Sequence, residues 1–287
     1  MSLVKDLFGV LKYAKRRLKE GITPVSNNNH KIKCFVLCNG PSLNDELPSL
    51  NIQDADCFVV NFFASSDYYE SVRPTGYFLL DPRFWRETSV KENVVKMYED
   101  MEAKTTWAMS LYVPKNSITD IKKFHTFLNP NIKVIPYSTA LAYSGFKKYE
   151  NYFYKKQWAT IPAQNVPLFA IYIALVLGYK HIELYGIDYS FFEGMVINDD
   201  NELCYSFRHF YGDEKPQLRK YIDVHTGKVV KLKDEIISVG NIYAQHEKME
   251  QFSHYMNATI INCTKKSMLD YYIRKSQIEK GKKNEKN

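Results

Sequence analysis

The sequence predicts an α/β fold with a single, mostly parallel sheet that is flanked by helices and carries a small lid insertion. Short apolar segments alternate with helical segments along most of the 287 residues, which is typical of strand–helix–strand units. Several of the apolar segments end in a short polar residue, as strands do at the ligand-binding edge of such sheets. Residues 189–245 are polar and aromatic and break the alternation, so this stretch is predicted to be the lid.

The first 30 residues are predicted to lie outside the main domain. Residues 2–19 form a basic amphipathic helix, which either lies on a membrane surface or packs on its own domain. Its apolar face comprises Leu3, Leu7, Phe8, Leu11, Ala14 and Leu18. Residues 21–30 have the composition of a linker.

The α/β domain is predicted to span residues 31–275. Runs of apolar residues predict strands at 32–38, 56–61, 76–81, 105–112, 132–135, 182–186 and 258–263. Helices are predicted at about 165–178, at 246–256 and from about 266. A basic tail, 276–287, follows the domain.

The positive charge of the chain is concentrated at its two ends. The net charge is +7, of which residues 1–20 carry +4 and residues 265–287 carry +5, leaving −2 for the rest. A nucleic-acid-binding domain would carry its basic face on the folded body, so nucleic acid is not an expected partner. Basic ends suit contact with an anionic membrane surface.

The cysteines and the hydropathy pattern indicate the cellular compartment of the protein. Five cysteines without CxxC spacing favour neither a disulfide framework nor a zinc site and suggest a reducing cytoplasm. The sequence shows no signal peptide and no apolar run long enough to span a membrane. We therefore expect a cytoplasmic protein that associates peripherally with the inner face of a cell membrane.

Three predicted strands end in short polar residues that point to a ligand site. Asn39 follows the first strand and leads into Gly40-Pro41-Ser42, Asn61 ends the second strand, and Asp81 ends the third. Parallel strands present their carboxyl ends to one crevice. Each residue alone is typical of a turn, but the three together favour a ligand site.

The chain lacks the common phosphate and metal motifs. Neither GxxxxGK[ST] nor GxGxxG occurs. The single Asp-x-Asp, Asp54-Ala55-Asp56, precedes a strand rather than following one, so it is predicted to be a turn or strand start. We therefore expect no metal and no cofactor.

Two histidines compete for the role of a general base. His246 is predicted to open a helix and to face the crevice if the lid returns there, but it is equally compatible with a surface histidine at a helix start. His209, within the predicted lid, is the other candidate.

Several segments together resemble the bacterial CMP-sialic acid-dependent sialyltransferases typified by the lipooligosaccharide enzymes of Campylobacter. The resemblance covers roughly residues 31–275. Its segments are Asn39-Gly40-Pro41-Ser42-Leu43, Asn61, Leu177-Gly178-Tyr179-Lys180, Gly186-Ile187-Asp188, Tyr205 and Tyr243-Ala244-Gln245-His246.

The resemblance implies a Rossmann-like, GT-A-like domain that transfers a sugar from a CMP donor with inversion and without a metal. It implies catalytic roles for His246, Tyr205 and Tyr189. The donor-binding residues it implies are Asn39, Gly40, Pro41, Ser42, Asn61, Asp81, Asn165, Gly186, Asp188 and Ser190.

The sequence departs from the family at the sugar side of the site. A family Asn is Asp81 here, the Arg and Ser expected near residues 163–166 are missing, and a phosphate-binding Tyr falls on Ser190 unless Tyr189 substitutes.

The sequence therefore predicts an inverting, metal-independent glycosyltransferase for lipooligosaccharide or capsule synthesis. Its partners would be a nucleotide-sugar donor, a glycan or glycolipid acceptor, a membrane surface and possibly further copies of the chain. Two alternatives stay open: an ATP-dependent transferase similar to the pterin pyrophosphokinases, and a non-catalytic partner in glycan assembly.

Overall fold

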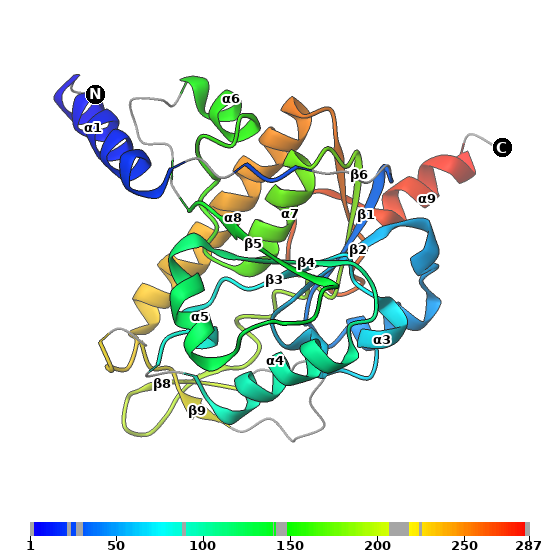
Figure 1. Cartoon of the computed structure of the whole chain (residues 1–287), viewed down its shortest axis with the longest axis horizontal. Helices are drawn as coiled ribbons and strands as arrows, with labels where there is room; N and C mark the ends of the chain where they lie inside the picture. Colours follow the sequence, from blue (N-terminus) through cyan, green and yellow to red (C-terminus); the bar gives the residue numbers. More distant parts are fainter. Residues whose placement is uncertain are drawn as a thin grey trace.

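A computed structural model of the chain describes residues 3–21, 24–26, 31–87, 90–139, 141, 148–206, 218–223 and 226–284. Within these residues the predicted α/β fold is confirmed: an eight-stranded sheet runs through the centre with helices on both sides (Figure 1). All pairings between its neighbouring strands are parallel.

The order of the strands reverses beside the first one. The sheet order is β11-β10-β6-β1-β2-β3-β4-β5. The chain therefore builds outward in one direction from β1 to β5 and then crosses back to place β6 on the other side of β1. The strand bounds are β1 Lys33–Leu37, β2 Asp56–Val60, β3 Gly76–Phe78, β4 Met109–Pro114, β5 Ile132–Tyr137, β6 His181–Tyr185, β10 Thr259–Asn262 and β11 Ile273–Arg274.

Alternate residues of the strands build two separate cores. On one face Phe35 and Leu37 of β1 pack with residues of α2 (Leu43–Glu46), α3 (Tyr69–Val72), α4 (Glu92–Lys104) and α5 (Ile118–Phe124). On the other face Cys34 and Val36 pack with residues of α6 (Glu150–Lys155), α7 (Val166–Val176) and α8 (Leu232–Tyr255). Because both faces are covered, the strands are apolar throughout, which explains why they could be predicted from apolar runs.

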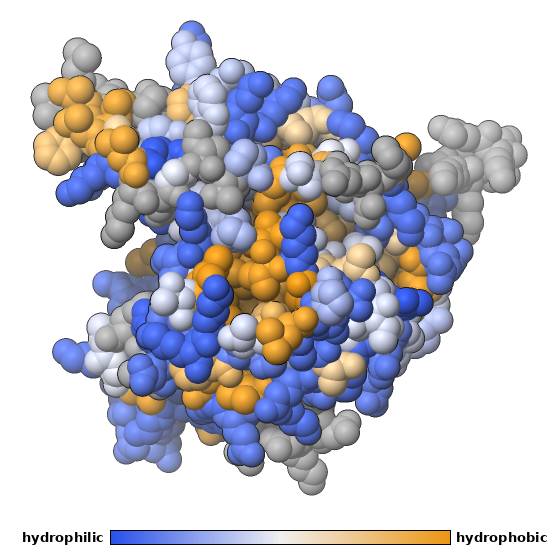
Figure 2. All heavy atoms as spheres, in the orientation of Figure 1, coloured by the Kyte–Doolittle hydropathy of each residue, from blue (hydrophilic) through white to orange (hydrophobic). Residues whose placement is uncertain are grey.

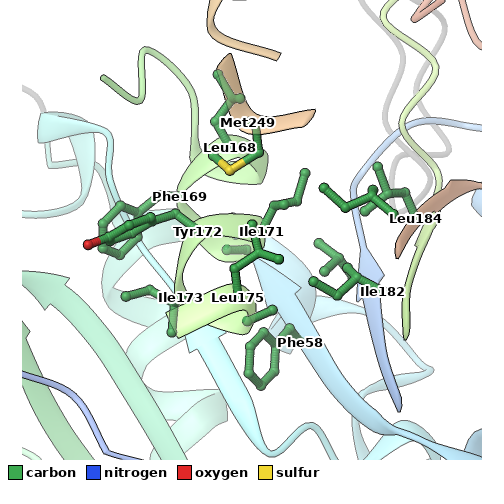
Figure 3. Close-up of a cluster of buried hydrophobic side chains, with 14 of the residues drawn as sticks. Phe58, Leu168, Phe169, Ile171, Tyr172, Ile173, Leu175, Ile182, Leu184 and Met249 are labelled. Carbon is green, nitrogen blue, oxygen red and sulfur yellow. The ribbon is translucent and has the colours of Figure 1, made fainter. Parts of the chain in front are cut away.

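The second core is centred on α7, which is apolar on every side. Figure 3 shows its side chains between Phe58 of β2, Ile182 and Leu184 of β6, and Met249 of α8. Pro167 at the first turn and the Asn165 side chain, which accepts a hydrogen bond from the N–H of Leu168 at 3.3 Å, fix where the helix begins. The position of this helix start relative to the sheet is important for the site.

Four predicted boundaries were wrong. The strand expected at 76–81 is β3, which ends at Phe78, so Asp81 lies beyond the strand. The helix that contains His246 begins at Leu232 rather than at residue 246, so His246 lies in its middle. The last helix, α9, is Lys275–Asn284, and residues 266–272 precede it without a helix. The strand expected at 105–112 is β4, which begins only at Met109.

The region predicted to be a lid contains a small antiparallel sheet. Its strands are β7 (Met195–Ile197), β8 (Leu203–Tyr205) and β9 (Arg219–Lys220), in that order. The predicted range of 189–245 also includes the first half of α8, which belongs to the main body.

Helix α1 (Leu3–Glu20) packs on the body with its polar side and leaves its apolar face exposed. Tyr13 donates a hydrogen bond to the carbonyl of Trp158 at 2.9 Å, and its ring packs against Phe153. The exposed apolar side chains are Leu7, Phe8, Leu11 and Leu18, and Figure 2 shows orange atoms on this helix at the upper left. None of the described helices is both long and apolar enough to cross a bilayer.

Candidate active site

A cavity of about 650 Å³, the first cavity, opens at the carboxyl ends of the central strands. Its walls are the segments that follow β1, β2, β3 and β6, together with the start of α7. Strands β1 and β6 are neighbours on either side of the reversal in strand order. Ligands of open α/β sheets bind in the crevice outside the carboxyl ends of the strands at such a reversal.

The loops after β1 and β6 approach so closely that both require glycine. The N–H of Gly40 donates to the carbonyl of Gly186 at 2.9 Å. A Cβ on Gly40 would lie 1.7 Å from Oδ2 of Asp188, and Gly186 has a φ of +63°. No side chain fits at Gly40 without moving this wall of the cavity.

Two buried carboxyl groups fasten this wall. Asp188 accepts hydrogen bonds from the N–H of Ser42 at 3.3 Å and from its hydroxyl at 2.8 Å. Glu46 accepts from the N–H groups of Gly186 at 3.1 Å and Lys265 at 2.9 Å. Burial raises the pKa of both carboxyls, and the hydrogen bonds partly oppose this shift.

Two asparagine side chains in the cavity wall each keep an acceptor oxygen without a partner. Asn39 is only 8% exposed, and its amide nitrogen donates to the carbonyl of Val60 at 3.1 Å. Asn61 adopts a left-handed backbone with a φ of 54°. The Oδ1 atoms of both residues are buried and have no hydrogen-bond partner. A buried acceptor without a donor is costly, so a ligand that donates hydrogen bonds would be stabilised here.

Another wall of the first cavity is formed by Asp81 and by the start of α7. Both carboxyl oxygens of Asp81 contact Arg83, through its N–H at 2.9 Å and its Nε at 3.0 Å. Asn165 caps α7 and also donates to the hydroxyl of Tyr189 at 2.7 Å. The positive end of the dipole of α7 therefore faces the cavity.

A chain of hydrogen bonds leads from the cavity wall into the core. The hydroxyl of Tyr189 lies 2.7 Å from Nε2 of His246, and Nδ1 of His246 lies 2.7 Å from the hydroxyl of Tyr272. His246 is 0% exposed, and burial lowers the pKa of its imidazole to about 3, so the ring is neutral at pH 7. Burial also raises the pKa values of both tyrosines well above the ordinary value.

The first cavity brings together most of the residues expected at the donor site. Those that line it are Asn39, Gly40, Pro41, Asn61, Asp81, Asn165, Gly186, Asp188, Tyr189 and Ser190. Ser42 lies directly behind the wall as the partner of Asp188.

The remaining predicted residues lie elsewhere. His246 contacts the cavity only through Tyr189, and Tyr205 packs its ring against Tyr221 in the small sheet, with ring centres 5.1 Å apart. His209 lies outside the described residues. Asp56, of the Asp-x-Asp motif, is buried and accepts from the hydroxyl of Tyr179 at 2.8 Å. Among the described residues, no three His, Cys, Asp or Glu side chains are grouped as potential metal ligands.

Sequence reasoning missed Glu46, Gln164 and Tyr272. Glu46 follows the Asn-Gly-Pro-Ser loop by four residues, and that closeness was the one signal that could have pointed to it. Gln164 lines the cavity beside Asn165, and Tyr272 reaches His246 from a separate segment. Neither has a sequence signal, because tertiary structure alone brings them to the site.

No protein-family model matches the chain, and no curated protein matches its sequence. Solved structures of similar fold exist, however. The MAf glycosyltransferase of Magnetospirillum magneticum AMB-1 matches over 96% of this chain with a TM-score of 0.51 and 15% identity. The monofunctional α-2,3-sialyltransferase Cst-I of Campylobacter jejuni matches over 87% of this chain and 82% of its own length, with a TM-score of 0.45 and 16% identity. The sialyltransferase CstII of the same organism matches with a TM-score of 0.44 and 16% identity, and the match covers 86% of each chain.

The similarity to the MAf protein supports the fold and no more. The chain spans 39% of the length of the MAf protein, so the activity of that longer protein does not transfer with the fold. The neighbours are glycosyltransferases, and the site must supply the argument for any shared activity.

Proposed function

We propose that the protein is a glycosyltransferase that moves a sugar from a nucleotide donor to a glycan hydroxyl. In its most specific form, the donor is CMP-sialic acid or a related CMP-sugar and the acceptor is a surface glycan. The observation that carries the proposal is the cavity at the reversal between β1 and β6, with its two unpartnered asparagine oxygens.

The donor would lie across the carboxyl ends of β1, β2 and β6. The Oδ1 atoms of Asn39 and Asn61 would accept hydrogen bonds from the hydroxyl or amino groups of the nucleoside. The start of α7 would stabilise the phosphate through its dipole, and the hydroxyl of Ser190 is available beside it. The carboxyl of Asp81 already contacts Arg83, which reduces its repulsion of an anionic donor. The part of Tyr205 in phosphate binding stays a prediction.

The transfer would be a single displacement with inversion and without a metal. The acceptor oxygen forms a bond to the anomeric carbon while the bond from that carbon to the phosphate oxygen breaks, and CMP leaves with the electron pair. The acceptor proton passes to the oxygen of Tyr189, whose own proton moves to Nε2 of His246. Tyr189 thus connects the cavity to a base that does not line it.

The low pKa of His246 sets a condition on this route. An imidazole with a pKa of about 3 is a weak base in the empty site. As the donor bond breaks, the phosphate gains negative charge in the cavity, on the other side of Tyr189 from His246, and a nearby negative charge favours the protonated imidazole. Proton transfer would therefore accompany departure of the nucleotide, which disfavours reaction before the acceptor is in place.

The acceptor would be reached at a membrane surface. The exposed apolar face of α1 is flanked by the exposed cations Lys12 and Lys15, an arrangement suited to an anionic bilayer. We expect sedimentation with vesicles that contain phosphatidylglycerol and loss of this binding in the Phe8→Ser/Leu11→Ser variant. If the variant and the wild type sediment equally, α1 is not the contact.

The chemistry is tested with Tyr189→Phe, which removes one hydroxyl and keeps the ring. We expect release of CMP from CMP-N-acetylneuraminic acid to fall by about 100-fold, with or without lactose as an acceptor probe. The affinity for CMP should change by less than about threefold, because the variant keeps the contacts that hold the nucleotide equally in the ground state and in the transition state. Tyr243→Phe is the matched control: its hydroxyl contacts the carbonyl of Met268 instead, so turnover should be unchanged.

Equal turnover in Tyr189→Phe and wild type would contradict the proton route. A wild-type protein that binds no CMP but binds ATP in the presence of Mg²⁺ would instead support the ATP-dependent transferase. A protein that binds no nucleotide would support the non-catalytic role.

A further inference from the structure

Exposed aromatic rings gather on and beside α6. Tyr152 on this helix is 43% exposed, and Trp158, three residues after its end, is 37% exposed. Their rings contact each other edge to face, with centres 5.7 Å apart. Tyr255 at the end of α8 is also 43% exposed. A single exposed ring is ordinary, but several together indicate an interaction surface.

Two lysines lie over these rings. Nζ of Lys156 is 5.8 Å from the ring centre of Tyr152, and Nζ of Lys155 is 5.8 Å from that of Tyr255. Both lysines are exposed. We call the three aromatic residues, together with Lys155 and Lys156, the α6 surface.

The positive charge of the α6 surface is not neutralised by neighbouring acids. No carboxylate in the described ranges of the chain forms an ion pair with Lys155 or Lys156. The one acid within residues 148–158 is Glu150, which pairs with Lys248 of α8 at 3.3 Å. The α6 surface is therefore complementary in charge to an anionic partner.

Helix α1 lies directly beside the α6 surface. The ring of Tyr13 packs against Phe153 with centres 5.6 Å apart, and its hydroxyl donates to the carbonyl of Trp158 at 2.9 Å. The rings of Phe153 and Trp158 are themselves in contact, with centres 5.5 Å apart. Figure 1 shows α1 and α6 next to each other at the upper left. The α6 surface and the exposed apolar face of α1 thus lie at the same end of the molecule.

The combination of side chains favours a bilayer over a soluble partner. Tyrosine and tryptophan prefer the headgroup layer of a membrane, because each ring is apolar and carries one polar group. Lysine can keep its stem in apolar surroundings while its ammonium group contacts lipid phosphates. A soluble anionic glycan could use the rings and the lysines, but it would leave Leu7, Phe8 and Leu11 of α1 exposed to water.

We propose that the α6 surface is a second contact with an anionic bilayer, in addition to α1. Its rings lie at the level of the headgroups, and Lys155 and Lys156 bind lipid phosphates. One helix alone would leave the body free to rotate, whereas two contacts fix which side faces the membrane. The inference rests on the proposed function for its partner, the bilayer, but it depends on neither the donor nor the chemistry.

The first test is sedimentation of the full chain with phosphatidylcholine vesicles, with and without phosphatidylglycerol. We expect wild type to bind the anionic vesicles. The Lys155→Gln/Lys156→Gln variant should bind them about 25-fold more weakly, at about fivefold for each lysine near an anionic surface. Lys275→Gln/Lys280→Gln is the matched control, because it removes the same charge from exposed positions of α9, which Figure 1 shows at the right. This control should bind as wild type does.

The second test is quenching of tryptophan fluorescence by vesicles with brominated acyl chains. The chain has three tryptophans. Trp85 is buried, and Trp107 is half-buried and donates from its Nε1 to the carbonyl of Pro74 at 2.8 Å. We expect quenching in wild type and its loss in Trp158→Phe, which keeps a ring beside Phe153.

Equal binding by the two lysine variants, or equal quenching in wild type and Trp158→Phe, would overturn the inference. Lysine-dependent binding to soluble polygalacturonate without binding to vesicles would overturn it as well, because the partner would then be a glycan. If Phe8→Ser/Leu11→Ser loses vesicle binding and the α6 lysine variant does not, the inference fails while the α1 contact stands. If the protein binds no CMP but its vesicle binding depends on Lys155 and Lys156, the proposed function fails while the α6 surface stands.

Discussion

The first cavity adjoins a second cavity of about 330 Å³, with which it shares Leu80, Ala163 and Gln164, but the two are built from different parts of the fold. The first lies at the ends of buried parallel strands, and its polar groups are fixed by backbone contacts such as that between Gly40 and Gly186. The second is bounded by α1 and by connecting segments, and side chains supply its polar contacts. The fold therefore fixes the proposed donor side rigidly, whereas peripheral segments form the second cavity.

The largest expected effect comes from adding one methyl group to the first cavity. In Gly40→Ala the new Cβ would meet Asp188 at 1.7 Å and the carbonyl of Gly186 at 2.5 Å. We expect a loss of about 3 kcal/mol in the free energy of unfolding, measured by urea denaturation. Gly240→Ala in α8 is the control: a Cβ there meets nothing within 4 Å, so it should stabilise by up to about 1 kcal/mol. If both variants have wild-type stability, the close approach of the two loops is wrong.

The second largest expected effect is the loss of stability when Glu46, the buried acid that joins these loops, is replaced. Glu46→Ala leaves the N–H groups of Gly186 and Lys265 without acceptors, at a cost of about 2 kcal/mol. Glu46→Gln keeps one acceptor oxygen and should lose about half as much. Arg16→Gln, in the second cavity, should change stability less than either. Denaturation curves of the three variants therefore compare how much the walls of the two cavities contribute to stability. A larger loss of stability in Arg16→Gln than in the Glu46 variants would contradict the comparison.

Much of the first cavity could be predicted because local sequence builds it. The polar residues Asn39, Asn61 and Asp81 each follow an apolar run, and a parallel sheet carries the ends of such runs to one edge. The reversal beside β1 could not be predicted, because it depends on which strand pairs with β6. The burial of His246 was also missed. The exposed Ile236 and Ile237 and the central Gly240 obscured the first half of α8 and moved the predicted helix start to residue 246.

The second cavity gave no comparable signal. The sequence identified α1 as basic and amphipathic but left open whether it packs on the domain. In the structure its polar side packs and its apolar face stays exposed, so Arg16 reaches the second cavity. Contacts between residues more than 100 positions apart, such as Arg16 with Thr139, have no local pattern.

A smaller effect concerns the dependence of stability on pH. Burial lowers the pKa of His246 from its ordinary 6.5 to about 3, so below pH 6.5 the unfolded chain binds a proton that the folded chain does not. Stability is therefore lost as the pH falls from 6.5 toward 3, by about 1.4 kcal/mol at pH 5.5. Glu46 and Asp188, whose pKa values are raised, act in the opposite direction.

The His246→Gln variant has no titratable group at this position. The contribution of the imidazole to the pH dependence is therefore the difference between the two proteins in how their free energy of unfolding changes with pH. Urea denaturation at pH 7.5 and pH 5.5 measures it. Parallel pH profiles for the two proteins would show that His246 is not held neutral in the core.

The smallest effect is at the start of α7. Asn165→Ala removes the cap at Leu168 and the donor to Tyr189, which should cost about 1 kcal/mol. Asn165→Asp keeps the cap and loses only the amide donor, so it should be closer to wild type in thermal unfolding. Equal losses in the two variants would assign the effect to the contact with Tyr189 rather than to the cap.

The central claim is that the first cavity holds the nucleotide of a sugar donor. Calorimetric titration of CMP into wild type and into Asn39→Ala, in buffer with EDTA, tests it most directly. The account predicts one saturable site in wild type and at least about tenfold weaker binding in the variant, because the amide that faces the nucleoside is gone. Absence of CMP binding to wild type, or equal affinity in the two proteins, would contradict it.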